Sequence, residues 1–79
     1  MGSLTTRSEY LALRTRFHIL LQRSIAVGSQ LLTAEQVDLL EEDDAAWDRI
    51  DLLLREFFQI QQEIDHVLRL GRKLQKQLN

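Results

Sequence analysis

The group of residues in this chain most able to do chemistry is Glu63-Ile64-Asp65-His66. Glutamate and histidine three positions apart share one face of a helix, and helical bundles that bind two metal ions use this spacing to direct ligands inward. The apolar pattern, however, gives the inward positions to Ile64 and Val67, so Glu63 and His66 are expected on the flank or in solvent. The sequence therefore predicts no metal site and no cofactor.

Basic side chains offer a second kind of chemistry. Small helical enzymes of the chorismate mutase type hold a dianion with several arginines and a glutamine or glutamate that point into a bundle core. In this chain the inward positions are apolar, and the arginines lie beside them, at Arg14, Arg16, Arg49 and Arg55. We therefore expect no catalytic residue and a protein that is not an enzyme.

The charged residues are unevenly distributed along the 79-residue chain, although the net charge is only −2. If the chain folds back once, acids gather at one pole of the molecule and bases at the other. Domains that bind nucleic acid are typically strongly basic, whereas this chain has a pI of about 5.6, so we predict no nucleic-acid partner. The bases are Arg7, Arg14, Arg16, Arg23, Arg69, Arg72, Lys73 and Lys76, and the acids are Glu35, Asp38, Glu41, Glu42, Asp43, Asp44, Asp48 and Asp51.

No part of the sequence predicts a membrane or export signal. No apolar run approaches the roughly 18 residues that a membrane-spanning helix needs. The start, Met1 to Thr6, fits the loose pattern for N-myristoylation but lacks the basic run that would reinforce a single acyl chain. The absence of cysteine suits a reducing compartment. We expect a soluble, cytoplasmic protein with no membrane partner.

The elements that position these side chains are helices, because the chain has no proline and is rich in Leu, Gln, Arg and Glu. Residues 6–9, Thr-Arg-Ser-Glu, resemble a capping box, so the first helix is expected to begin there and residues 1–5 to be disordered. From that point, residues at alternating steps of three and four form an apolar seam with one small polar member: Tyr10, Leu13, Phe17, Leu20, Ser24, Val27 and Leu31.

The second half carries a longer seam, interrupted by one glycine. A 3-4 repeat of this kind is typical of a left-handed helix pair with knobs-into-holes packing. Leu54, Phe58 and Leu68 lie beside the second seam, and Leu21 and Ile25 beside the first, so each apolar face is wider than a two-helix contact requires. The seam residues are Ile50, Leu53, Phe57, Ile60, Ile64, Val67, Gly71, Leu74 and Leu78.

We predict an all-α fold: residues 1–79 form one antiparallel hairpin of two long helices, completed as a four-helix bundle by dimerisation or a partner helix. The favoured turn is at residues 42–44, with Asp44 capping the second helix. This turn places Phe17 opposite Gly71. The alternative is a break near Gly28 and a short middle helix over 34–42, which places Tyr10 opposite Gly71.

The stretch from Leu39 to Arg55, LLEEDDAAWDRIDLLLR, followed by Ile60-x-x-x-Ile64, resembles the core of the FliT-type flagellar export chaperones and their FlgN-like relatives. The resemblance covers about residues 17–68 and rests on a helix that ends in an acidic turn, a Trp-Asp pair and paired leucines. It implies a cytoplasmic chaperone for type III secretion that receives an amphipathic helix of its client. Family members tend to have further helices after this hairpin.

The composition leads to a similar expectation, because two broad apolar faces leave surface that another polypeptide must cover. We therefore predict a non-enzymatic binding module for an amphipathic helix, with a self-assembling scaffold hairpin as the alternative and a homodimer as the expected assembly. The predicted partner-binding residues are Leu21, Ile25, Trp47, Leu54, Phe57, Phe58 and Leu68.

Overall fold

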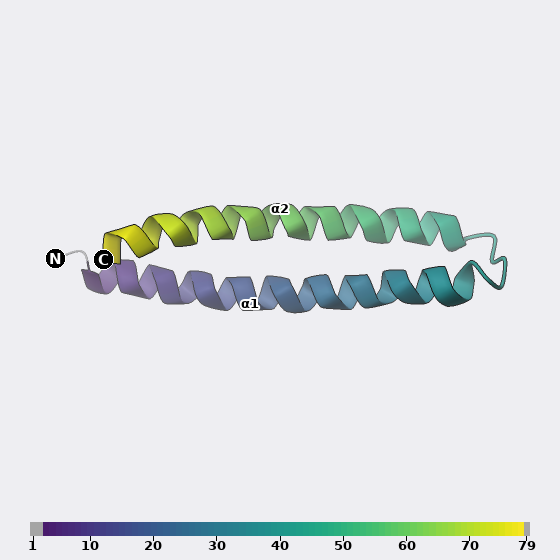
Figure 1. Ribbon diagram of the computed structural model, residues 1–79, viewed down its shortest axis with the longest axis horizontal. Helices are drawn as coiled ribbons and strands as arrows, with labels where there is room; N and C mark the ends of the chain where they lie inside the picture. Colours follow the sequence, from purple (N-terminus) through teal and green to yellow (C-terminus); the bar gives the residue numbers. More distant parts are fainter. Residues whose placement is uncertain (1–2, 79) are drawn as a thin grey trace.

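The computed structural model describes residues 3–78 and is a long helical hairpin (Figure 1). Helix α1 covers Ser3–Thr33, the π-helical turn η1 covers Ala34–Asp38, and helix α2 covers Ala46–Leu78. The two long helices pack against each other, with no strand in the described part of the chain, in a rod whose Cα atoms span 61 × 14 × 14 Å. The predicted all-α hairpin is confirmed.

Helix α1 runs without interruption through Gly28, so the alternative with a break at this glycine is wrong. A glycine in a helix costs only about 1 kcal/mol relative to alanine, which the packing of its neighbours Val27 and Leu31 outweighs. Thr33 does not cap a new helix. Its backbone is helical, and its hydroxyl donates a hydrogen bond to the carbonyl oxygen of Ser29 at 3.1 Å.

The start of the helix also differs from the prediction. Helix α1 begins at Ser3, so Thr6 lies within the helix rather than at its cap, and residues 3–5 are helical where we expected disorder. Met1 and Gly2, which carry the acylation pattern, lie outside the described residues.

The predicted seams are confirmed, because every seam residue on both helices is buried or half-buried. Five of them form the core: Leu20, Val27, Ile60, Ile64 and Val67. Five more pack against this cluster: Leu13, Phe17, Leu31, Leu53 and Phe57.

The register between the helices differs from both predicted registers. A Cβ atom on Gly71 would lie 3.8 Å from Cδ2 of Leu13, so this glycine faces a leucine and not Phe17 or Tyr10. The side chain of Gln61 donates a hydrogen bond to the Ser24 hydroxyl at 3.1 Å, which agrees with the same register. The reason lies in the connection, because α1 and η1 together end at Asp38 and residues 39–45 form the turn. This longer turn moves the pairing by about three residues from the favoured register.

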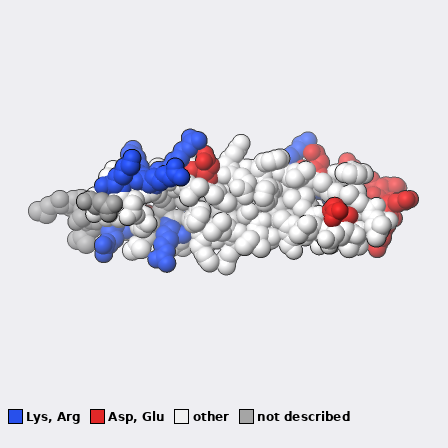
Figure 2. Space-filling view, in the orientation of Figure 1, with Lys and Arg blue, Asp and Glu red and all other residues white. Residues whose placement is uncertain are grey.

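The charges separate along the rod as predicted. Acidic side chains gather around the turn, and basic side chains gather at the end where both termini lie (Figures 1 and 2). Between these ends the surface in Figure 2 is almost free of charge. On α1, residues 24–34 include no charged side chain.

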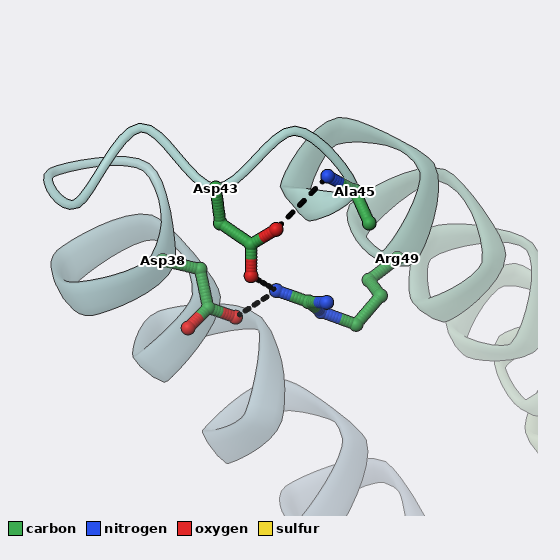
Figure 3. Close-up of polar contacts among 4 residues, drawn as sticks. All are labelled: Asp38, Asp43, Ala45 and Arg49. Carbon is green, nitrogen blue, oxygen red and sulfur yellow. Dashed lines mark hydrogen bonds and ion pairs between the residues drawn. The ribbon is translucent and has the colours of Figure 1, made fainter.

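The turn is closed by Asp43 and Arg49 (Figure 3). The Asp43 carboxylate accepts a hydrogen bond from the backbone N–H of Ala45 at 3.0 Å and one from the Arg49 guanidinium at 2.6 Å. The same guanidinium nitrogen lies 3.1 Å from the Asp38 carboxylate. Asp43 therefore caps α2, and the prediction that Asp44 does so is wrong. The turn also requires a left-handed backbone at Glu42, with φ of 57°.

Candidate protein-binding face

The exposed large hydrophobic side chains of the described residues are not scattered evenly. Twelve are exposed: seven of these directly follow a seam residue in the sequence, and Trp47 follows Ala46, a buried residue four positions before the seam residue Ile50. Of the other four, Ile19 and Leu52 directly precede the seam residues Leu20 and Leu53, Val37 precedes the half-buried Asp38 of η1, and Leu40 lies in the turn. We call the set of eight the apolar face: Leu11, Leu21, Ile25 and Leu32 on α1, and Trp47, Leu54, Phe58 and Leu68 on α2.

The eight residues share one side of the hairpin for a geometrical reason. On a right-handed helix, the residue after a seam position is rotated by about 100° in a fixed sense. The second helix runs in the opposite direction and also presents its seam from the opposite side. These two reversals cancel, so residues that follow the seam lie on the same side of both helices.

A hollow at the open end of the rod supports this arrangement. Four residues that follow a seam position line it together, one from α1 and three from α2: Arg14, Leu68, Arg72 and Gln75. Its volume is about 540 Å³, and its apolar walls include Leu13, Phe17, Val67 and the backbone of Gly71. We call it the Gly71 notch, since the missing side chain of this glycine opens it.

The structure places six of the seven predicted partner-binding residues on the apolar face. Ile25, Trp47 and Phe58 are the most exposed of them, at 72%, 69% and 61%. Phe57 lies elsewhere, because it is half-buried and packs against the core cluster of the hairpin itself. The prediction omitted Leu11 and Leu32, whose signal was their place directly after the seam residues Tyr10 and Leu31.

Charged groups border the apolar face without interrupting its centre. Asp51 and Asp65 also follow seam residues, but each forms an ion pair with an arginine four residues later on its own helix, at 2.9 and 3.0 Å. Arg14 and Glu35 lie near the two ends of the face, and neither forms an ion pair within residues 3–78. The middle of the face is therefore apolar, and its ends carry opposite charges.

The sequence motif that pointed to metal chemistry lies off this face. Glu63 is half-buried and His66 is exposed on α2. Within the described residues, no group of three or more His, Cys, Asp or Glu side chains is placed to hold a metal ion. None of the helices described is long and apolar enough to cross a membrane.

The turn holds a cluster of charged groups whose hydrogen bonds shift their pKa values. The hydrogen bond from Arg49 lowers the pKa of Asp43 below its ordinary value, and the bond from the Ala45 N–H lowers it further. The hydrogen bonds that the Arg49 guanidinium donates, to Asp43 first and then to Asp38, raise the pKa of Arg49. All three groups are committed to one another in closing the turn, which gives the cluster a structural role.

Comparison with known proteins adds no name to this geometry: no family model matches the chain, and no curated protein or solved structure matches it significantly.

Proposed function

We propose that the chain is a non-enzymatic protein-binding module whose apolar face packs against helices of another polypeptide and so completes a four-helix bundle. The observation that carries this proposal is the concentration of eight of twelve exposed large hydrophobic side chains on one side of the hairpin. A concentration of exposed apolar side chains of this kind marks an interaction site, because leaving it in water is unfavourable.

The apolar face suits a helical partner. It runs along the rod on one side of both helices, and such an extended apolar surface suits an amphipathic helix laid along it. The three most exposed residues include the aromatic side chains of Trp47 and Phe58, and aromatic residues commonly supply most of the binding energy of an interface.

Two kinds of partner fit the proposal. The resemblance to flagellar export chaperones suggests an amphipathic helix of a secreted client. The alternative is a self-assembling scaffold in which a second copy supplies the partner helices. The opposite charges at the ends of the apolar face favour the second copy, because a copy placed in the opposite direction sets acids against bases.

The experiment compares two substitutions on α2, Phe58→Asp and Leu52→Asp. Phe58 is 61% exposed on the apolar face, and Leu52 is 65% exposed on the other side, so the two changes are matched in exposure and charge. We would measure sedimentation at micromolar concentration, together with the fluorescence of 1-anilinonaphthalene-8-sulfonate, a dye that binds accessible apolar surface.

We expect Phe58→Asp to abolish association, or dye binding if the wild type is monomeric, while its helical circular dichroism is retained. Leu52→Asp should behave as the wild type does. If both variants match the wild type, or both lose association and dye binding equally, the apolar face is not a binding surface.

A further inference from the structure

Two features of the hairpin identify the polypeptide that covers the apolar face. The first is the Gly71 notch at the open end, whose apolar walls are bordered by Arg14, Arg72 and Lys76. The second is Trp47 at the turn end, which is 69% exposed and surrounded in sequence by acids. The apolar walls and basic border of the notch suit an apolar side chain that has acidic neighbours. Trp47 at the turn end is such a side chain.

We propose that two copies of this chain pack face to face with their long axes antiparallel, so that Trp47 of each copy enters the Gly71 notch of the other. This inference rests on the proposed function, because it names the partner of the same apolar face. It is a closed, two-fold arrangement in which the same surface of each copy meets its counterpart.

The register of the hairpin makes the two ends correspond. Leu13 lies opposite Gly71, and in this register Trp47 lies level with Val37. A two-fold axis that exchanges these two levels passes midway between them, at Ile25. This position is at the centre of the apolar face, where Ile25 and Phe58 are exposed side by side on the two helices. The axis required by the notch is thus also the centre of the surface to be covered.

The same axis brings opposite charges together. The acids of the turn end lie over the basic open end of the second copy, and the reverse holds at the other pole (Figure 2). On α1, Glu35 of one copy faces Arg14 of the other, although neither has an ion-pair partner within residues 3–78. A parallel two-fold arrangement would instead bring both acidic turns together at one pole and both basic ends together at the other. Like charges at both poles would oppose that arrangement.

The size of the apolar side is sufficient for a stable dimer. One side of a rod whose Cα atoms extend 61 × 14 Å has an area of roughly 850 Å², close to the roughly 800 Å² per partner of a standard interface.

The decisive experiment measures the distance between spin labels in the full chain. The protein contains no cysteine, so a single Glu41→Cys substitution labels each turn specifically. An antiparallel dimer centred on Ile25 predicts a distance of about 50 Å between the two labels, from 1.5 Å of rise per residue. A parallel dimer predicts about 20 Å, since the turns would lie side by side. Gln22→Cys, near the axis, should give a short distance in either dimer and serves as the control.

A second experiment exchanges charges. Arg14→Glu alone, or Glu35→Arg alone, should weaken dimerisation by about two- to thirty-fold, from 0.2–1 kcal/mol at each of two equivalent contacts. The double variant with both changes should restore the wild-type dissociation constant, because the two charges still face each other with opposite sign. Additive weakening in the double variant would contradict the antiparallel contact.

Trp47 gives a third readout as the single tryptophan of the chain. Its emission should shift to shorter wavelength as the protein concentration rises through the dissociation constant. Gly71→Leu, which fills the notch, should prevent this shift, and the Phe58→Asp variant should keep the emission of a solvated indole. A shift that persists in Gly71→Leu would show that Trp47 does not use the notch.

The failure of this inference and of the proposed function give different results. A monomer at every concentration, or labels about 20 Å apart, overturns the antiparallel dimer. The apolar face itself remains supported in either case if Phe58→Asp, and not Leu52→Asp, removes dye binding or association.

Discussion

At the scale of single residues, Asp43 shows how one carboxylate ends one element and begins the next. Its carboxylate accepts one hydrogen bond from the backbone N–H of Ala45, the residue directly before α2, and another from the guanidinium of Arg49 in the first turn of α2. Four consecutive acids occupy positions 41–44, so each was a candidate cap. The choice of Asp43 depends on the left-handed backbone at Glu42, which no local sequence preference indicated since non-glycine residues rarely adopt it.

The lowered pKa of Asp43 predicts a pH-dependent contribution to stability. Because the folded-state pKa lies below the ordinary value of 3.8, the contribution is fully present above that value and is lost as pH falls through the folded-state pKa. Asp43→Asn keeps an oxygen for the Ala45 N–H but removes the charge that pairs with Arg49. We expect the variant to be less stable than the wild type at pH 7, with the difference shrinking below about pH 4.

Urea unfolding at a series of pH values, at one protein concentration, measures this difference. Asp44→Asn is the control, since Asp44 is an exposed neighbour that makes no hydrogen bond or ion pair within the described residues. If both substitutions lower the free energy of unfolding equally, or if the loss caused by Asp43→Asn is as large at pH 2 as at pH 7, the charge of Asp43 does not stabilise the turn.

At the scale of elements, the repeat of apolar residues determined most of what could be predicted. Both seams, the antiparallel hairpin and the side on which Leu21, Ile25, Leu54, Phe58 and Leu68 emerge follow from helical periodicity alone. The register does not, because shifting one helix along the other by a turn keeps apolar residues in contact. The length of the connection decides the register, and that length depends on η1 and on the backbone at Glu42.

The two classes of apolar residue predict different responses to truncation. Ile60 is 2% exposed in the core, and Ile25 is 72% exposed on the apolar face. Ile60→Ala should lower the free energy of unfolding by about 2–5 kcal/mol at every protein concentration. In the wild type, the temperature of the unfolding midpoint should rise with protein concentration, because association stabilises the folded chain. Ile25→Ala should chiefly remove this rise, because in the proposed dimer the side chain of Ile25 contacts the second copy.

Thermal unfolding at several concentrations, followed by circular dichroism, separates these effects. If Ile25→Ala costs as much as Ile60→Ala at the lowest concentration, Ile25 contributes to the hairpin itself rather than to an interface.

At the scale of the whole molecule, the hairpin is a rod with acids at one end, bases at the other and an apolar side between them. A second copy placed in the opposite direction brings acidic side chains beside basic ones, whereas a copy placed in the same direction brings like charges together. Small net charge conceals the arrangement, since the opposite charges nearly cancel in the total of −2. The electrostatic part of the association should weaken with added salt, as it depends on exposed charges.

The central claim is that another polypeptide covers the apolar face and leaves the opposite side in water. The five isoleucines of the chain allow one direct measurement, the relaxation of their methyl groups by a soluble paramagnetic agent at increasing protein concentration. Ile60 and Ile64 are buried within the hairpin, whereas Ile19 is 50% exposed away from the apolar face and Ile25 lies at its centre.

We predict that relaxation of Ile25 falls to the level of Ile60 and Ile64 as the protein associates, while relaxation of Ile19 stays high. Equal and undiminished relaxation of Ile25 and Ile19 at every concentration, without association, would contradict the claim.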